Sequence, residues 1–124
     1  MAETPKRILL VDDDPILRMG FRDLLENAGY AFHSVAGGAE ALQLAQEQNF
    51  ALIILDLLMP RPNGFEVFRR LKELSVASRT PILILTVVGL EPQVQNLLQQ
   101  GAHYLSKQRA PRGLVAKVRE LIGE

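Results

Sequence analysis

The sequence predicts an α/β fold in which a parallel sheet carries helices on both faces. Short runs of large apolar residues alternate along the chain with segments of helical apolar periodicity. Alternating strand and helix units of this kind form doubly wound parallel sheets with right-handed crossovers. The chain has 124 residues, of which 48% are apolar, which suffices for a sizeable core. We therefore expect residues 1–124 to form a single domain.

Five strands are expected where short apolar runs are rich in isoleucine, leucine and valine. They cover residues 7–11, 30–36, 50–56, 81–86 and 103–107. The second of these runs is the weakest. The third is apolar up to its last residue, which is typical of a central strand buried on both faces. It ends on Asp56, and Pro60 then prevents the ladder from continuing.

Five helices are expected between and after these strands. They cover residues 15–28, 39–48, 65–74, 92–100 and 111–122. Asp14 is a favourable N-cap for the first helix, Pro15 suits its first position, and Gly29 ends it. Pro92 opens the fourth helix, whose apolar stripe is narrow and whose other positions are rich in glutamine.

Bulk composition excludes several classes of function. The chain has 14 basic and 14 acidic residues, so its net charge gives no reason to expect binding to nucleic acid or to an anionic membrane. It contains no cysteine, which excludes disulfides and thiol chemistry. Residues 1–7 lack the apolar core of a signal peptide, and no apolar run is long enough to span a bilayer. We therefore expect a cytoplasmic protein without membrane contact.

Polar residues follow the apolar runs at the expected strand ends: Asp12, Asp13, Asp56, Thr86 and Lys107. The carboxyl ends of parallel strands share one edge of the sheet, where open α/β folds bind ligands. Three carboxylates gathered there resist joint ionisation unless a cation joins them, and oxygen ligands favour Mg²⁺ where phosphate also binds. With an ammonium and a hydroxyl added, the set can hold a phosphoryl group, one carboxylate acting as the nucleophile.

These motifs, in this order, make the chain resemble the receiver domain of bacterial two-component response regulators, of the chemotaxis-regulator kind. The resemblance covers essentially the whole chain and rests on Val11–Asp13, Asp56–Pro60, Gly64, Thr86, Tyr104 and Lys107. It implies a flavodoxin-like (βα)5 fold with strand order 2-1-3-4-5. It also implies a phosphoprotein of phosphorelay signal transduction that transfers a phosphoryl group to its own residue and is not a turnover enzyme.

The resemblance implies that Asp56 is the phosphoryl acceptor and that Mg²⁺ is the cofactor. Asp13 and Asp56 would bind Mg²⁺ directly, together with the backbone carbonyl of Leu58, and Asp12 would act through a metal-bound water. Lys107 would pair first with Asp56 and then with the phosphoryl group.

A switch and a set of partners are implied as well. Thr86 would move toward the phosphoryl group, and Tyr104 would rotate inward into the space that Thr86 leaves. The donor would be a histidine kinase or a histidine phosphotransfer protein. A downstream protein would read the face made by the fourth helix, the fifth strand and the fifth helix, and a phosphorylation-dependent homodimer is compatible with this scheme. No output segment follows the last expected helix, so we expect a stand-alone or excised receiver that does not bind nucleic acid directly.

Four residues at the rim of the expected site depart from the family pattern. Gln108 follows Lys107 where the family usually has a cis proline, so we expect a trans peptide and a reshaped loop. Val87 stands where the family prefers a small residue. Leu58 and Val88 are apolar at the positions that flank the path of the attacking water, so we expect slow loss of the phosphoryl group.

Other functions stay open from the sequence. The departures at Gln108 and Val87 leave open a degenerate receiver that binds partners without phosphorylation. A Mg²⁺ phosphatase with an aspartyl nucleophile would need a second carboxylate at the position of Leu58. A flavodoxin would need a loop rich in serine, threonine and glycine in place of Asp12–Asp14.

Overall fold

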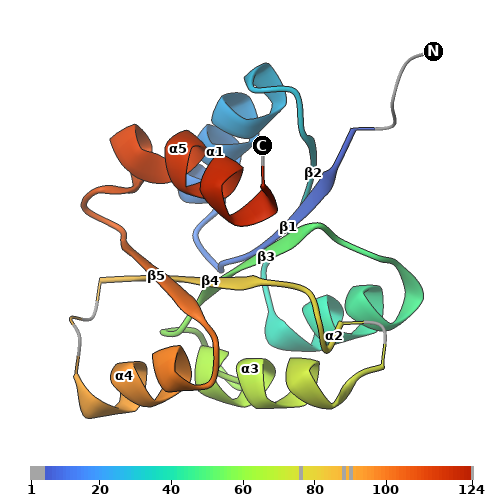
Figure 1. The fold of residues 1–124 in the computed structure, drawn as a ribbon, viewed down its shortest axis with the longest axis vertical. Coiled ribbons are helices and arrows are strands. Elements are labelled where there is room, and N and C mark those ends of the chain that lie inside the picture. Colours follow the sequence, from blue (N-terminus) through green and yellow to red (C-terminus); the bar gives the residue numbers. More distant parts are fainter. Residues whose placement is uncertain (1–4, 76, 88, 90, 124) are drawn as a thin grey trace.

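The structure, a computed structural model, describes residues 5–75, 77–87, 89 and 91–123. Five parallel strands form one sheet in the order β2-β1-β3-β4-β5 (Figure 1). Their bounds are β1 Arg7–Val11, β2 Ala31–Val35, β3 Leu52–Asp56, β4 Ile82–Thr86 and β5 His103–Ser106. The expected parallel sheet and its strand order are therefore confirmed.

Helices cover both faces of the sheet. Their bounds are α1 Pro15–Asn27, α2 Gly38–Glu47, α3 Gly64–Glu73, α4 Pro92–Gln99 and α5 Ala110–Ile122. Helices α1 and α5 lie on one face, and α2, α3 and α4 lie on the other (Figure 1). In the part of the chain that the structure describes, no helix is both long enough and apolar enough to cross a bilayer.

The core consists of two layers, one on each side of the sheet. Because successive residues of a strand point to opposite faces, Ile53 and Leu55 of β3 pack toward α3, whereas Leu52 and Ile54 pack toward α1 and α5. Every residue of β3 is buried. The burial of the whole strand explains its apolar sequence, and it places the last residue of β3, Asp56, at the edge of the apolar core.

Several element ends differ from the expected ones by one or two residues. Strand β3 begins at Leu52 and not at residue 50, although Phe50 is buried, because the sheet pairing of β1 with β3 starts at Ile8 and Leu52. Strand β5 ends at Ser106, so Lys107 is the first residue of the turn that leads into α5. The ladder still determines its position, since the Lys107 N–H donates to the carbonyl of Thr86 at 3.0 Å.

The connection from β3 to α3 folds closely over the backbone of the strand end. Asn63 caps α3 by accepting a hydrogen bond from the Glu66 N–H at 3.0 Å, and the Gly64 N–H donates to Leu57 O at 3.0 Å. A Cβ at Gly64 would lie 2.3 Å from Asp56 O and 2.4 Å from Leu57 Cα. Both neighbours are backbone atoms, which cannot make room by a change of rotamer, so only glycine fits at this position.

We expect Gly64→Ala to lower the free energy of unfolding by about 2 kcal/mol or more, because the new methyl group forces the backbone at Asp56 to move. Gly20→Ala is the matched control, since a Cβ at Gly20 meets nothing within 4 Å and this glycine lies inside helix α1. The control should raise stability by about 0.5–1 kcal/mol. Urea unfolding of both variants checks the pair, and equal effects would contradict the packing argument.

Candidate functional site

Two carboxylates and one threonine side chain are buried at the carboxyl edge of the sheet. Asp12 and Thr86 are 0% exposed and Asp56 is 2% exposed. Asp12 follows β1, while Asp56 and Thr86 end β3 and β4. Burying a carboxylate costs free energy unless a partner compensates it. The concentration of this cost at one edge marks the edge as a functional site.

Asp12, Asp13 and Asp56 form a group that can hold a metal ion. One carboxylate oxygen of each lies within 4.8 Å of the others, and Asp13 faces solvent. Burial, and then the negative charge of Asp12, raise the pKa of Asp56 to about 6. A site of crowded oxygen ligands in which one carboxylate resists ionisation fits a hard divalent cation such as Mg²⁺.

Lys107 supplies the positive charge of the site. Its Nζ lies 2.9 Å from Asp12 Oδ2 and 3.3 Å from Asp56 Oδ2. Burial acts to lower the pKa of Lys107, but the hydrogen bond with Asp12 and the charges of both carboxylates outweigh burial and raise it. Arg61–Pro62 is the cis peptide among the described residues, so Lys107–Gln108 is trans, as expected. The ammonium therefore reaches both carboxylates without the cis peptide usual in the family.

Hydrogen bonds hold the turn from β1 to α1 in place. The Asp14 N–H donates to Asp12 Oδ1 at 2.9 Å, and Asp14 Oδ1 accepts from the N–H groups of Ile16 and Leu17 at 3.0 and 3.4 Å. Asp14 is thus the N-cap of α1, as expected. Arg18 Nη1 donates to the backbone carbonyl of Asp12 at 2.8 Å. Sequence reasoning missed Arg18; the one signal was a basic residue near the start of a helix, where its charge is unfavourable.

The remaining sequence-predicted residues surround this cluster. The Leu58 N–H donates to Asp56 Oδ1 at 3.2 Å. Thr86 is buried at the end of β4, and Tyr104, half-buried on β5, packs against the core layer on the side of α3 and α4. Their motions on activation stay predictions. Val88 lies outside the described residues.

Large apolar side chains are exposed near the site. In the described part of the chain they are Ile16, Met19, Leu58 and Val87, each more than half exposed. Ile16, Leu58 and Val87 lie within a few residues of the carboxyl ends of β1, β3 and β4. The rim of the acidic site is therefore partly apolar, as a surface that receives another protein would be.

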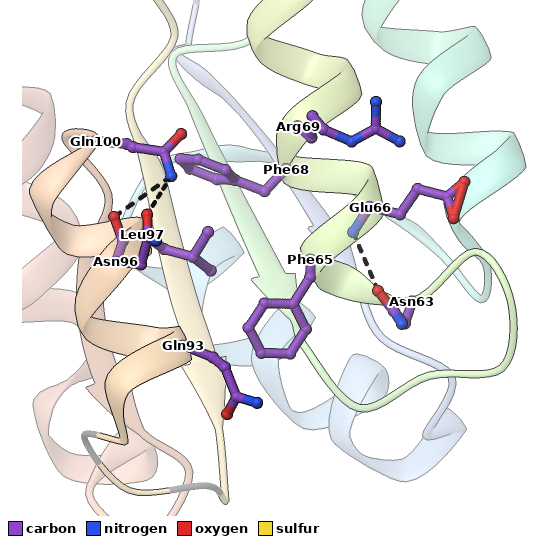
Figure 2. Close-up of a pocket in the computed structure, with 9 residues that line it drawn as sticks. All are labelled: Asn63, Phe65, Glu66, Phe68, Arg69, Gln93, Asn96, Leu97 and Gln100. Atoms are coloured by element: carbon purple, nitrogen blue, oxygen red, sulfur yellow. Dashed lines mark hydrogen bonds between the residues drawn. The ribbon is translucent and has the colours of Figure 1, made fainter.

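A separate cavity of about 470 Å³ lies between α3 and α4 (Figure 2). Phe65, Phe68 and Leu97 supply its apolar side chains, and amide side chains such as those of Gln93 and Asn96 line its α4 side. None of the strand-end carboxylates lines it. We therefore place the chemistry at the carboxylate cluster and not in this cavity.

Comparison with known proteins gives a consistent result. The sequence model of the response regulator receiver domain matches residues 8–119. The transcriptional regulatory protein SrrA of Staphylococcus aureus is 36% identical over 116 residues, which are 93% of this chain and 47% of SrrA. The chain thus spans about half the length of that relative.

Two solved structures share the fold at similar identity. The chemotaxis protein CheY4 of Vibrio cholerae matches with a TM-score of 0.87 and 32% identity, covering 95% of this chain and 99% of CheY4. The receiver domain of the sensor histidine kinase PA1611 of Pseudomonas aeruginosa, solved with a magnesium ion in its active-site cleft, matches with a TM-score of 0.87 and 30% identity, covering 98% of this chain and all of that one.

We expect Asp56→Asn to raise the free energy of unfolding in EDTA at pH 7.5. The folded pKa of about 6 lies above the ordinary 3.8, so the ionised carboxylate destabilises the folded state by about 3 kcal/mol at most above pH 6. That penalty shrinks as the pH falls from 6 toward 4, so the advantage of the variant should fall by more than half at pH 4.5.

Urea unfolding of the wild type and the variant at both pH values tests this expectation. Asp13→Asn serves as the control, since its carboxylate is exposed and should have a much smaller effect. A stabilisation by Asp56→Asn that does not depend on pH would contradict the explanation.

Proposed function

Because this chain belongs to the family of response regulator receiver domains, we propose that it accepts a phosphoryl group on Asp56 and passes the signal on by protein contact. One observation carries the proposal: the carboxylate of Asp56, which is only 2% exposed, lies beside two further carboxylates and 3.3 Å from the ammonium of Lys107. We take residues 1–124 as one receiver domain that acts in the cytoplasm and has no turnover activity.

The donor in this proposal is a phosphohistidine on a histidine kinase or a histidine phosphotransfer protein. A carboxylate oxygen of Asp56 attacks phosphorus, an O–P bond forms, and the N–P bond to the imidazole breaks. The electron pair of that bond stays with the imidazole nitrogen, which takes up a proton. The exposed apolar side chains of Ile16, Leu58 and Val87 support a protein donor, since they offer contact area around the acceptor.

In this proposal Lys107 and a bound Mg²⁺ balance the charge at the acceptor. Lys107 pairs with Asp56 before transfer and with the phosphoryl oxygens after it. Mg²⁺ would be held by Asp13, Asp56 and the backbone carbonyl of Leu58, and by Asp12 through a water, and would neutralise phosphoryl charge. The N–H of Leu58 steadies the attacking carboxylate through its hydrogen bond to Oδ1.

The output in this proposal runs from Thr86 to the α4–β5–α5 face. Thr86 moves toward the phosphoryl group, and Tyr104 turns into the space that it leaves. Residues 92–106, which form α4 and β5, contain no aspartate, glutamate, lysine or arginine. The uncharged α4 and β5 part of this face suits a protein partner or a second copy of the chain, and so supports the proposed downstream contact and homodimer.

Incubation with acetyl phosphate and MgCl₂ tests the acceptor. We expect the intact mass of the wild type to rise by one phosphoryl group. Asp13→Glu should show the same rise in a smaller fraction of its molecules, and the mass of Asp56→Asn should stay unchanged. Asp23→Asn, on the surface of α1, is the control and should react as the wild type does. No adduct on the wild type would instead indicate the alternative, a degenerate receiver that acts by binding alone.

Leu58 sets the lifetime of the phosphoryl group in this proposal, because an apolar side chain beside Asp56 does not orient an attacking water. We expect Leu58→Asn to lose the phosphoryl group several-fold faster than the wild type when acetyl phosphate is removed. Leu58→Met keeps an apolar side chain and should stay slow. Equally fast loss in the wild type and Leu58→Asn would refute the role of Leu58.

A further inference from the structure

Arg18, in the first turn of α1, contacts the turn that carries two of the candidate Mg²⁺ ligands. Its Nη1 donates a hydrogen bond of 2.8 Å to the backbone carbonyl of Asp12. Within residues 5–75, 77–87, 89 and 91–123, the guanidinium of Arg18 forms no ion pair, and its hydrogen bond is to this carbonyl. The side chain is partly buried.

The energetics of helix α1 do not account for this placement. A positive charge near a helix N-terminus is disfavoured by the helix dipole. The first N–H groups of α1 are capped by Asp14, and a guanidinium, which only donates hydrogen bonds, could not cap them. Side chains on a helix lean toward its N-terminus, and Arg18 therefore reaches back to the turn before the helix. The contact serves the turn and not the helix.

The N–H, the carbonyl and Oδ1 of Asp12 form hydrogen bonds, and Oδ2 forms an ion pair with Lys107. Arg18 supplies the partner of the carbonyl. The Asp12 N–H donates to Val35 O at 3.1 Å, Oδ1 accepts from the Asp14 N–H at 2.9 Å, and Oδ2 lies 2.9 Å from Lys107 Nζ. The pairing of β1 with its neighbours ends at Val11. The Asp12 carbonyl therefore lies beyond the ladder, and Arg18 takes the place of a strand partner.

The same carbonyl belongs to the peptide that joins Asp12 to Asp13. Because a peptide unit is planar, a hydrogen bond that fixes the carbonyl also fixes the direction in which the chain enters Asp13. That direction decides whether the exposed carboxylate of Asp13 stays within 4.8 Å of Asp12 and Asp56.

We propose that Arg18 is a positioning residue for the divalent-cation site, in that its hydrogen bond to the Asp12 carbonyl holds the Asp12 and Asp13 carboxylates in their binding arrangement. This inference rests on the Mg²⁺ site of the proposed function. Two effects of Arg18 have opposite signs. As a nearby positive charge, it repels Mg²⁺, whereas as a clamp on the ligand turn it strengthens Mg²⁺ binding. The clamp is the larger effect.

Calorimetric titration of the whole chain with MgCl₂ tests the inference. We expect Arg18→Met to bind Mg²⁺ about three- to tenfold more weakly than the wild type, since loss of a group that orients metal ligands lowers affinity to this extent or more. Arg18→Lys keeps the charge and part of the reach, and should recover part of the affinity. The control is Arg22→Met, which removes the same charge one turn further along α1. The guanidinium of Arg22 lies over the ring of Phe32, so this variant should bind Mg²⁺ as tightly as the wild type or slightly more tightly.

A second measurement separates positioning from general stability. The amide NMR signal of Asp14, whose N–H donates to Asp12 Oδ1, should shift in Arg18→Met and stay in place in Arg22→Met. Arg18→Met that binds Mg²⁺ as tightly as the wild type, or more tightly, overturns the inference even if the variant is less stable. If that happens and the wild type still takes a phosphoryl group, the proposed function stands and only the role of Arg18 falls. A wild type that binds no Mg²⁺ overturns both the metal site and the role of Arg18.

Discussion

Lys107 Nζ lies between two buried carboxylates, 2.9 Å from Asp12 and 3.3 Å from Asp56. One ammonium cannot neutralise both, and Asp13 adds a third negative charge at the solvent side. The excess negative charge raises the pKa of Asp56 and leaves the site in need of a cation. Much of the architecture around the site keeps these charges close together and buries Asp12 and Asp56.

The sheet brings the charges together, and the loops hold them there. Parallel pairing places the ends of β1, β3 and β4 side by side, so residues more than forty positions apart in the chain meet at one edge. The β3–α3 loop folds onto Asp56 through Gly64, while the β1–α1 turn is held by Asp14 and Arg18. Backbone contacts at the strand ends thus hold the buried charges in place, which is why the site depends on backbone geometry as much as on side chains.

The arrangement also links Asp56 to the turn between β5 and α5. The backbone of Lys107 is bonded to Thr86, and the side chain of Lys107 is bonded to Asp12 and Asp56. A change of charge at Asp56 therefore acts directly on the turn between β5 and α5 and on the end of β4. Strand β5 is the edge of the sheet and is only half-buried, so it has fewer packing constraints than β3 and β4. Movement there costs less than movement of the central strands.

The sequence by itself determined the fold class, the order of the elements and the identity of the charged residues. Apolar runs at strand spacing, helix caps such as Asp14 and polar residues at strand ends are local signals, and local signals can be read without coordinates. The sequence did not determine the ends of β3 and β5, because these depend on where the ladder with the neighbouring strand stops. It indicated Asp56 as the partner of Lys107, but the structure shows that Asp12 is the nearer carboxylate. Only the tertiary structure brought Arg18 to the carbonyl of Asp12, because that contact depends on the angle at which α1 leaves the turn, and no residue pattern records such an angle.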